Sequence, residues 1–415
     1  MFAIDILLRS YYNLGQWQEV LNVAAQFPES NTNSAVKRAR SKLIPHHRQE
    51  AKKPQPESLW EWNLDDLLSN WRLEDRRLWL RHPWGYVYWD MPEGFSLDAT
   101  SPALLHLALE VLLGPWVPET KRWKASRPTG QRLALSYSGG VDSTAAMLLL
   151  PDDTLLAYHE RDFPSMLSHS LPHQTFEAVR ERTGREVVCI PSNHEVLRTF
   201  HGKQTGFSTA HAAGAHLILL ADHFNLQGIA FGTPIDNTWL KKGKTYRDFS
   251  EAFYWTHWSK KFLQAGLHYV LPINHISEAG ALMVCKQSPL VDVVNSCLRG
   301  DEERWCGRCW KCFHKNGPLG RSFDPTSTEI QTFLNTTPLR TAQHALWALK
   351  TQDLGHLVPH LAPFLEADLS WWEQAYRPGL ALIDEQWRTG VEERTTGYLN
   401  WMEEPAPLEG VDLQV

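Results

Sequence analysis

The sequence predicts an α/β protein with a doubly wound parallel sheet, an N-terminal α+β accessory region and a helical C-terminal extension. Between residues 131 and 320, short apolar segments typical of buried strands alternate with helix-like segments, which favours a parallel sheet covered on both faces. A turn rich in glycine and serine, Ser138 to Ser143, follows the first of these strands. The 415 residues, 43% of them hydrophobic, suffice for two or three globular domains.

Residues 1–45 are predicted to form two short amphipathic helices on either side of Gly15. The stretch LLRSYYNLGQWQEVLNVAAQFP is similar to one tetratricopeptide-type helical hairpin. A single hairpin of this kind cannot bury its own apolar face, so we expect it to dock on another surface. The polar, proline-bearing residues 46–58 are predicted to form a linker.

Residues 59–130 are predicted to form a tryptophan-rich accessory domain. The stretch LWLRHPWGYVYWDMP predicts a β-hairpin that turns between Pro83 and Gly85, and residues 101–114 are expected to form a helix. Tryptophans most often fill a core or an interface, and we prefer that interpretation to an aromatic platform for a sugar or a base. The tryptophans concerned are Trp60, Trp62, Trp71, Trp79, Trp84, Trp89, Trp116 and Trp123.

Residues 131–320 form the predicted α/β domain, in which a ligand binds at the carboxyl ends of the strands, where the strand order reverses. The expected strands lie at 132–138, 154–160, 186–192, 228–234 and 268–274. The expected helices lie at 143–150, 171–184 and 208–225. Residues 321–415 are expected to form a mostly helical extension, in which we recognise no motif.

The turn from Ser138 to Ser143 has the residue types of an anion-binding loop. Its glycines let the backbone approach a ligand closely, and the N–H groups at the start of the following helix favour an anion. Ser138 and Ser143 add hydroxyl groups, and Asp142 is best explained in such a site if it helps to hold Mg²⁺. The loop lacks the lysine and adjacent serine or threonine of a Walker-type loop.

Four of the six cysteines cluster in the pattern Cys-x8-Cys-x2-Cys-x2-Cys. Four thiolates suit tetrahedral Zn²⁺, and a closed site of this kind is structural rather than catalytic. Redox-active thiols are the alternative interpretation of the cluster. The predicted zinc ligands are Cys297, Cys306, Cys309 and Cys312, while Cys189 and Cys285 are expected to be buried core thiols.

The six residues Ser-Gly-Gly-Val-Asp-Ser resemble the pyrophosphate loop of the N-type ATP pyrophosphatases. This resemblance implies a fold of the adenine nucleotide alpha hydrolase type, also called HUP. It also implies cleavage of ATP between its α- and β-phosphates, with transfer of AMP to an oxygen of the substrate. Within this superfamily, the loop and the cysteine spacing together are most similar to 7-cyano-7-deazaguanine synthase, and the similarity covers residues 131–318.

The resemblance also implies roles for individual residues. The loop would bind ATP, with Asp142 and Ser143 as its catalytic members, and Asp236 and Arg247 would contact the substrate. The ATP-binding residues would be Ser138, Gly139, Gly140, Val141, Asp142 and Ser143.

The chain departs from the synthase pattern at several places. Val141 stands where the family commonly has glutamine, and Ser277 and Glu278 stand where it has a lysine. The stretch from Trp305 to Cys312, WCGRCWKC, resembles a second family, the ATP-dependent epimerase of UDP-N-acetylmuramoyl-L-alanyl-L-glutamate. That resemblance implies activation of a carboxylate, which acidifies the adjacent C–H group for epimerisation.

We therefore expect an AMP-forming, ligase-type enzyme that uses ATP, Mg²⁺ and Zn²⁺ and activates a carboxylate, as 7-cyano-7-deazaguanine synthase does. The alternatives are the epimerase, a tRNA thiolase with a catalytic cysteine pair, and a non-catalytic nucleotide-binding module. The expected partner is a small-molecule carboxylate, with a peptide or protein acceptor as an alternative. His211 is the histidine that we consider best placed as an acid–base group.

Charge and hydropathy narrow the expected location and partners. The net charge of −6 gives no general attraction to nucleic acids or anionic membranes. No apolar run approaches the roughly 20 residues needed to span a bilayer, and the N-terminus lacks the features of a signal peptide. We therefore expect a cytoplasmic protein with neither a membrane nor a nucleic-acid partner.

Overall fold

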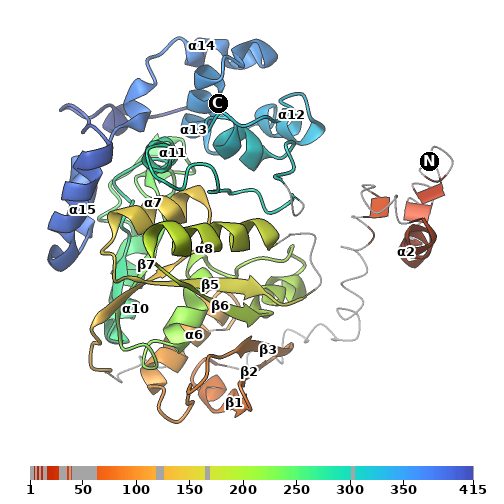
Figure 1. The fold of residues 1–415 in the computed structure, drawn as a ribbon, viewed down its shortest axis with the longest axis vertical. Helices are drawn as coiled ribbons and strands as arrows, with labels where there is room; N and C mark the ends of the chain where they lie inside the picture. The colour runs from red at the N-terminus through yellow and green to blue at the C-terminus, as the bar shows by residue number, and fades with distance from the viewer. Residues whose placement is uncertain are drawn as a thin grey trace.

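The computed structural model describes residues 63–117, 126–163, 169–300 and 304–414, together with 16–27 and a few positions between 4 and 39. The main body is built on one eight-stranded sheet with the strand order β1-β2-β3-β6-β5-β4-β7-β10 (Figure 1). Its parallel strands are β4 (Arg132–Ser136), β5 (Leu155–Arg161), β6 (Val187–Ser192), β7 (Leu226–Phe231) and β10 (His268–Val270).

The parallel part of the sheet confirms all five predicted strands. In chain order its strands are arranged third, second, first, fourth and fifth, so that β4 lies between β5 and β7. After β4 the chain forms β5 and β6 on one side of β4, and it later forms β7 and β10 on the other side of β4. The carboxyl end of β4 lies at this reversal, which is the position where α/β sheets bind ligands.

The tryptophan-rich region extends the same sheet with antiparallel strands. These are β1 (Trp71–Glu74), β2 (Arg77–His82) and β3 (Gly85–Asp90). The predicted hairpin is confirmed, with His82 opposite Gly85, and β3 joins the parallel strands where Trp89 pairs with Ser192. Trp71 and Trp89 are buried with ring centroids 5.7 Å apart, as expected of core residues. Trp60, Trp62 and Trp123 lie outside the described residues.

Helices lie on both sides of the sheet (Figure 1). They are α6 (Pro102–Leu113), α7 (Val141–Leu149), α8 (Ser170–Thr183), α9 (Ala215–Leu219), α10 (Phe253–Gln264), α11 (Glu278–Lys286), α12 (Thr328–Leu334), α13 (Ala342–Thr351), α14 (Ala362–Leu365) and α15 (Glu385–Tyr398). The single helix expected over 208–225 is instead a 3-10 turn, η4 (Ala210–Gly214), followed by the short α9. Gly214 at this junction packs so closely on β7 that an added Cβ would lie 2.7 Å from the ring of Phe231.

The C-terminal residues are largely helical, as predicted, and they pack into the main core. Trp347 of α13 and Trp372 are completely buried there. One continuous hydrophobic cluster reaches from Leu64 to Val411 and includes residues from the accessory, α/β and C-terminal regions. The three regions therefore share one core, and the boundaries between them stay predictions.

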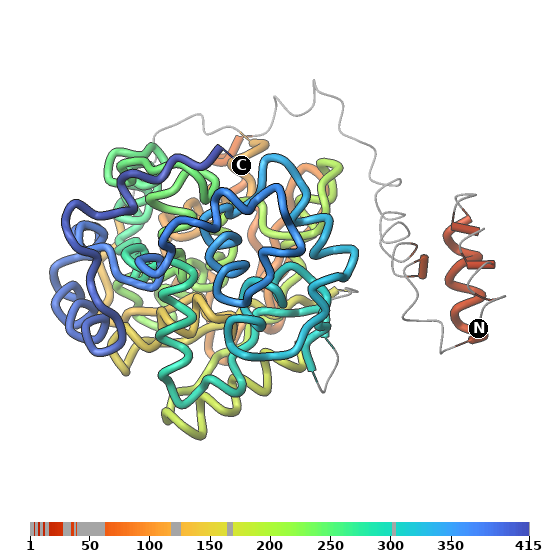
Figure 2. Tube along the Cα trace, turned by 90° about the horizontal axis from the view of Figure 1, so that it is seen from above, coloured from red at the N-terminus to blue at the C-terminus, as the bar shows by residue number. Residues whose placement is uncertain are grey.

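The N-terminal helix α2 (Trp17–Gln26) lies apart from the main body in both views (Figures 1 and 2). Its buried residues Val20 and Ala24 pack in a small cluster whose described members all come from residues 4–39. Within the described part of the chain, no helix is both long enough and apolar enough to cross a membrane.

Candidate functional site

The loop from Ser138 to Ser143 joins the carboxyl end of β4 to α7. Gly139 has a φ of +70°, a conformation that favours glycine, and Gly140 is the N-cap residue of α7. The Ser138 and Ser143 hydroxyl oxygens lie 3.0 Å apart, and the Ser143 hydroxyl donates to the Gly140 carbonyl oxygen. Gly140 has no side chain that could cap the first turn of α7. Binding of an anion at the start of this helix stays a prediction.

The segment just before Cys297 holds this loop in place. The Val141 backbone N–H donates to the Ser296 hydroxyl oxygen at 3.1 Å, and the Asn295 N–H donates to the Gly139 carbonyl oxygen at 3.4 Å. The loop is thus tied by hydrogen bonds to residues that come more than 150 positions later in the chain.

Gly232, directly after β7, supports the loop from the other side. An added Cβ would lie 3.0 Å from two backbone atoms of Asp142 and 3.1 Å from the Cα of Ser143. We expect Gly232→Ala to destabilise the fold by about 1–3 kcal/mol because the backbone at the start of α7 has to move. Gly397→Ala in α15 is the control, since its Cβ would meet nothing within 4 Å and would favour the helix by about 0.5–1 kcal/mol.

Denaturant unfolding of both glycine variants measures this difference. Equal unfolding free energies for Gly232→Ala and the unmodified protein would show that β7 does not constrain the loop.

Lys315 forms the centre of a polar network beside the loop. Its Nζ donates to Asp142 Oδ1 at 2.7 Å and lies 2.8 Å from Glu278 Oε2, and its side chain is only 5% exposed. The Glu278 backbone N–H donates to Asp236 Oδ2 at 2.8 Å. The network therefore connects the end of β7, the start of α11 and the first turn of α7.

Burial and charge set the ionisation of this network. Burial acts to raise the pKa of Glu278, but the charge and hydrogen bond of Lys315, together with His344 and His314, lower this pKa to about 2. The two carboxylates raise the pKa of Lys315 against its burial. Burial, together with the charge of Glu278, holds the pKa of Asp236 well above its usual range. Lys315 and Glu278 thus form an ion pair, while the raised pKa of Asp236 favours its neutral form.

The four predicted zinc ligands converge on one point. The distances between their sulfur atoms are 3.5 Å for Cys297 and Cys306, 3.7 Å for Cys297 and Cys309, 3.6 Å for Cys309 and Cys312, and 3.8 Å for Cys306 and Cys312. A tetrahedral zinc ion about 2.3 Å from each sulfur requires sulfur–sulfur distances of about 3.8 Å. The donor set and its geometry therefore fit Zn²⁺. Gly307 has a φ of +67°, which permits the tight turn.

One π-helical turn, η6 (Cys312–Asn316), connects the cysteine cluster with the network. It carries Cys312 at its start and Lys315 three residues later. Turns of this kind are frequent at functional sites. The sequence analysis notes the missing lysine at Ser277 but does not identify Lys315, whose place beside the loop only the fold shows.

The two predicted substrate contacts lie close to each other. Asp236 is buried in the short turn η5 (Ile235–Asn237), and it belongs to the network. The Arg247 guanidinium donates to the carbonyl oxygens of Thr238 and Asn237, at 2.7 and 3.1 Å. Arg247 thus stabilises the backbone next to Asp236. The contacts of both residues with a substrate stay predictions.

The expectation for His211 is wrong. Its side chain is buried in an aromatic core, where Nε2 lies 3.0 Å from the Tyr269 hydroxyl oxygen and the ring packs on Tyr254 and Trp258. Burial lowers its pKa to about 3, so the imidazole stays neutral. The prediction assumed that the start of a helix over 208–225 faces the ligand-binding cleft, whereas the tertiary packing buries His211.

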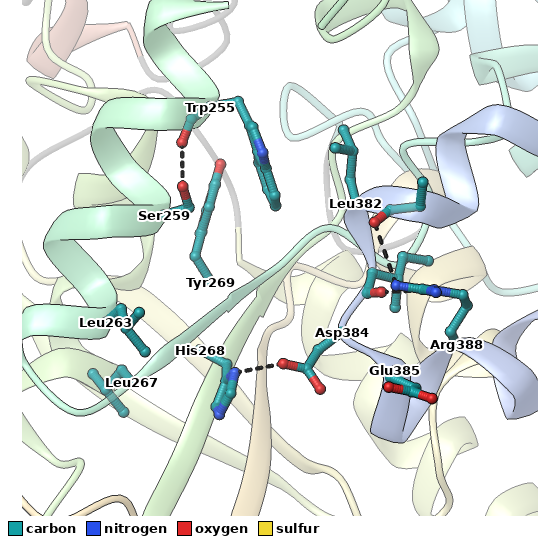
Figure 3. Close-up of a pocket in the computed structure, with 12 residues that line it drawn as sticks. Trp255, Ser259, Leu263, Leu267, His268, Tyr269, Leu382, Asp384, Glu385 and Arg388 are labelled. Atoms are coloured by element: carbon teal, nitrogen blue, oxygen red, sulfur yellow. Dashed lines mark hydrogen bonds and ion pairs between the residues drawn. The ribbon is translucent and has the colours of Figure 1, made fainter. Parts of the chain in front are cut away.

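A pocket of about 390 Å³ lies elsewhere, along β10 between α10 and the start of α15 (Figure 3). Trp255 and Tyr269 line one wall, and the ion pair between His268 and Asp384, at 2.9 Å, lies near the other (Figure 3). Since His268 is the first residue of β10, this pocket lies away from the carboxyl ends of the strands. None of its lining residues belongs to the loop, the network or the cysteine cluster.

Comparison with protein families gives a match to part of the chain. Residues 257–406 match a family of unknown function, DUF6395. The matched region includes Glu278, the four cysteines and Lys315, but it begins after the loop at Ser138 to Ser143. No curated protein matches this chain.

Proposed function

We propose that this protein is an AMP-forming enzyme that activates a substrate carboxylate. In this proposal it is similar to the N-type ATP pyrophosphatases, and its sheet is doubly wound and of the HUP type. The main support is the position of the loop. Its glycines and hydroxyl groups lie at the carboxyl end of β4, where the strand order reverses, beside the ammonium group of Lys315.

In this proposal the loop and the start of α7 bind the β- and γ-phosphates of ATP through backbone N–H groups and the serine hydroxyls. Asp142, 31% exposed, would hold Mg²⁺, which supplies positive charge to the phosphates when bound. An oxygen of the substrate carboxylate attacks the α-phosphorus, and the bond to the bridging oxygen of the β-phosphate breaks. Pyrophosphate leaves, and the substrate becomes an acyl-adenylate.

Lys315 provides the cation that the sequence lacks at Ser277. Its Nζ is held 2.7 Å from Asp142 Oδ1, beside the loop that would bind the phosphates. This placement favours catalysis over the non-catalytic alternative, which was based on the missing lysine.

The two remaining cysteines disfavour the tRNA thiolase alternative. Burial raises the pKa of Cys189 to about 11 and raises that of Cys285 further. The Cys285 thiol also donates to the Val141 carbonyl oxygen at 3.4 Å. Neither thiol has the lowered pKa of a nucleophilic cysteine.

Release of AMP and pyrophosphate from Mg-ATP tests the proposal. The protein is assayed alone, with 7-carboxy-7-deazaguanine and ammonium, and with a UDP-muramoyl dipeptide. AMP that appears only with the deazaguanine supports a synthase, and AMP that appears only with the dipeptide supports the epimerase. Binding of ATP without AMP in any mixture would contradict both of these activities.

The variant Lys315→Met tests the role assigned to this lysine. We expect AMP formation to fall by about 10²–10³-fold, because a preorganised charge at the phosphates is lost. Lys286→Met is the control, since Lys286 is exposed on α11. Turnover by Lys315→Met at the rate of the control would show that Lys315 does not act on the phosphates.

A further inference from the structure

We propose that Glu278, His314 and His344 bind a divalent transition-metal ion, at a second metal site separate from the four cysteines. Each of the three residues offers one ligand atom, and these atoms lie within 4.8 Å of one another. All three side chains are buried, and both histidines are completely so. We call this group the Glu-His-His site.

The histidines of this site have unused ring nitrogens. Among the described residues, neither nitrogen of His314 has a hydrogen-bond partner, and Nδ1 of His344 also has none. A buried polar group without a partner costs about 1–3 kcal/mol. A bound ion would satisfy the nitrogens directed at it.

Three separate elements bring the ligands together. Glu278 is the first residue of α11, His314 lies in the π-helical turn η6, and His344 lies in α13. His344 Nε2 lies 3.7 Å from Glu278 Oε2 and donates to the His314 carbonyl oxygen at 3.1 Å, so binding of an ion through Nε2 would replace this hydrogen bond. The Glu278 backbone is fixed in turn by its hydrogen bond to Asp236. Such outer contacts orient metal ligands in proteins.

The surrounding charge favours a cation but also provides a competitor. Glu278 and Asp142 share the single ammonium group of Lys315, which lies 2.8 Å from Glu278 Oε2. A metal ion on Glu278 therefore competes with Lys315 for the same carboxylate. Occupation of the site would leave Lys315 paired with Asp142 alone, which links this site to the loop.

The donor atoms define the class of metal. Two imidazole nitrogens and one carboxylate oxygen suit Zn²⁺, Co²⁺, Fe²⁺ or Mn²⁺, whereas Ca²⁺ and Mg²⁺ prefer sites made only of oxygen. Three protein ligands also leave at least one coordination position open. The site thus differs from the closed site of the four cysteines.

Metal content tests the proposal on the full chain. The protein is loaded with excess Zn²⁺, dialysed, and its zinc content per chain is measured by elemental analysis. We expect two zinc ions per chain in the unmodified protein, one ion in His344→Gln, and two in the control His360→Gln, which changes an exposed histidine of the same region. One ion per chain in the unmodified protein would overturn the proposal.

A second measurement does not require a histidine variant to fold. In Lys315→Met the competing ammonium group is absent, so the second Zn²⁺ should bind more tightly, by on the order of tenfold in a chelator competition. A second ion that binds Lys315→Met no more tightly than the unmodified protein would place it away from Glu278 and contradict the assignment. Because neither readout involves ATP, failure of this proposal is distinct from failure of the proposed enzymatic function.

Discussion

Replacing Asp142 with alanine is expected to abolish AMP formation from ATP while the chain still folds. Asp142 lies in the first turn of α7, with Oδ1 2.7 Å from Lys315 Nζ, and it is the carboxylate that we assign to Mg²⁺. Its loss removes a metal ligand and frees Lys315 from the loop, and we expect turnover to fall by at least about 10²–10³-fold. AMP and pyrophosphate release with Mg-ATP and the active substrate measures the effect.

Two further variants make this result specific. Asp142→Asn keeps the shape of the side chain but is a poor Mg²⁺ ligand, so it should be nearly as inactive. Asp153→Ala changes an exposed aspartate after α7 and should keep full turnover. Since Lys315 retains Glu278 as a partner, the stability cost in Asp142→Ala should be limited to about 1–3 kcal/mol. Full turnover by Asp142→Ala would refute the loop assignment.

The second large effect is expected for Cys309→Ser. The Cys309 sulfur is buried and lies 3.7 Å from the Cys297 sulfur and 3.6 Å from the Cys312 sulfur. Serine therefore removes one of the four sulfur ligands of the predicted zinc ion. Structural zinc sites contribute apparent free energies on the order of 10 kcal/mol. We therefore expect this variant to lose the zinc ion of the cysteine cluster and to unfold at a markedly lower temperature.

Elemental analysis and thermal unfolding check this expectation, with Cys189→Ser as the control outside the cluster. The effect should extend to the loop, because Ser296 precedes the first zinc ligand and Lys315 follows the last one in the same π-helical turn. A Cys309→Ser protein with unchanged zinc content and melting temperature would exclude the four-cysteine site.

The elements predicted correctly are those whose signal is local. The strand and the helix around the loop follow from apolar runs and from two glycines. The spacing of the four cysteines is enough to predict that their sulfur atoms converge. Lys315 could not be found in this way, because its partner Asp142 lies 173 positions earlier. His211 was misplaced for the same reason. Its neighbours Tyr254 and Tyr269 come from distant segments, and only tertiary packing determines that it is buried.

The long separation between the loop and its partners has a consequence during protein synthesis. Ser296 and Lys315 come 155 and 173 residues after the loop residues that they contact. At roughly 5–20 residues per second, a ribosome adds Lys315 about 9–35 s after Asp142. A nascent chain therefore carries a complete glycine-rich loop long before the residues that hold it have been made. On the proposed function, the growing chain gains the ability to consume ATP only when its last third has emerged and folded.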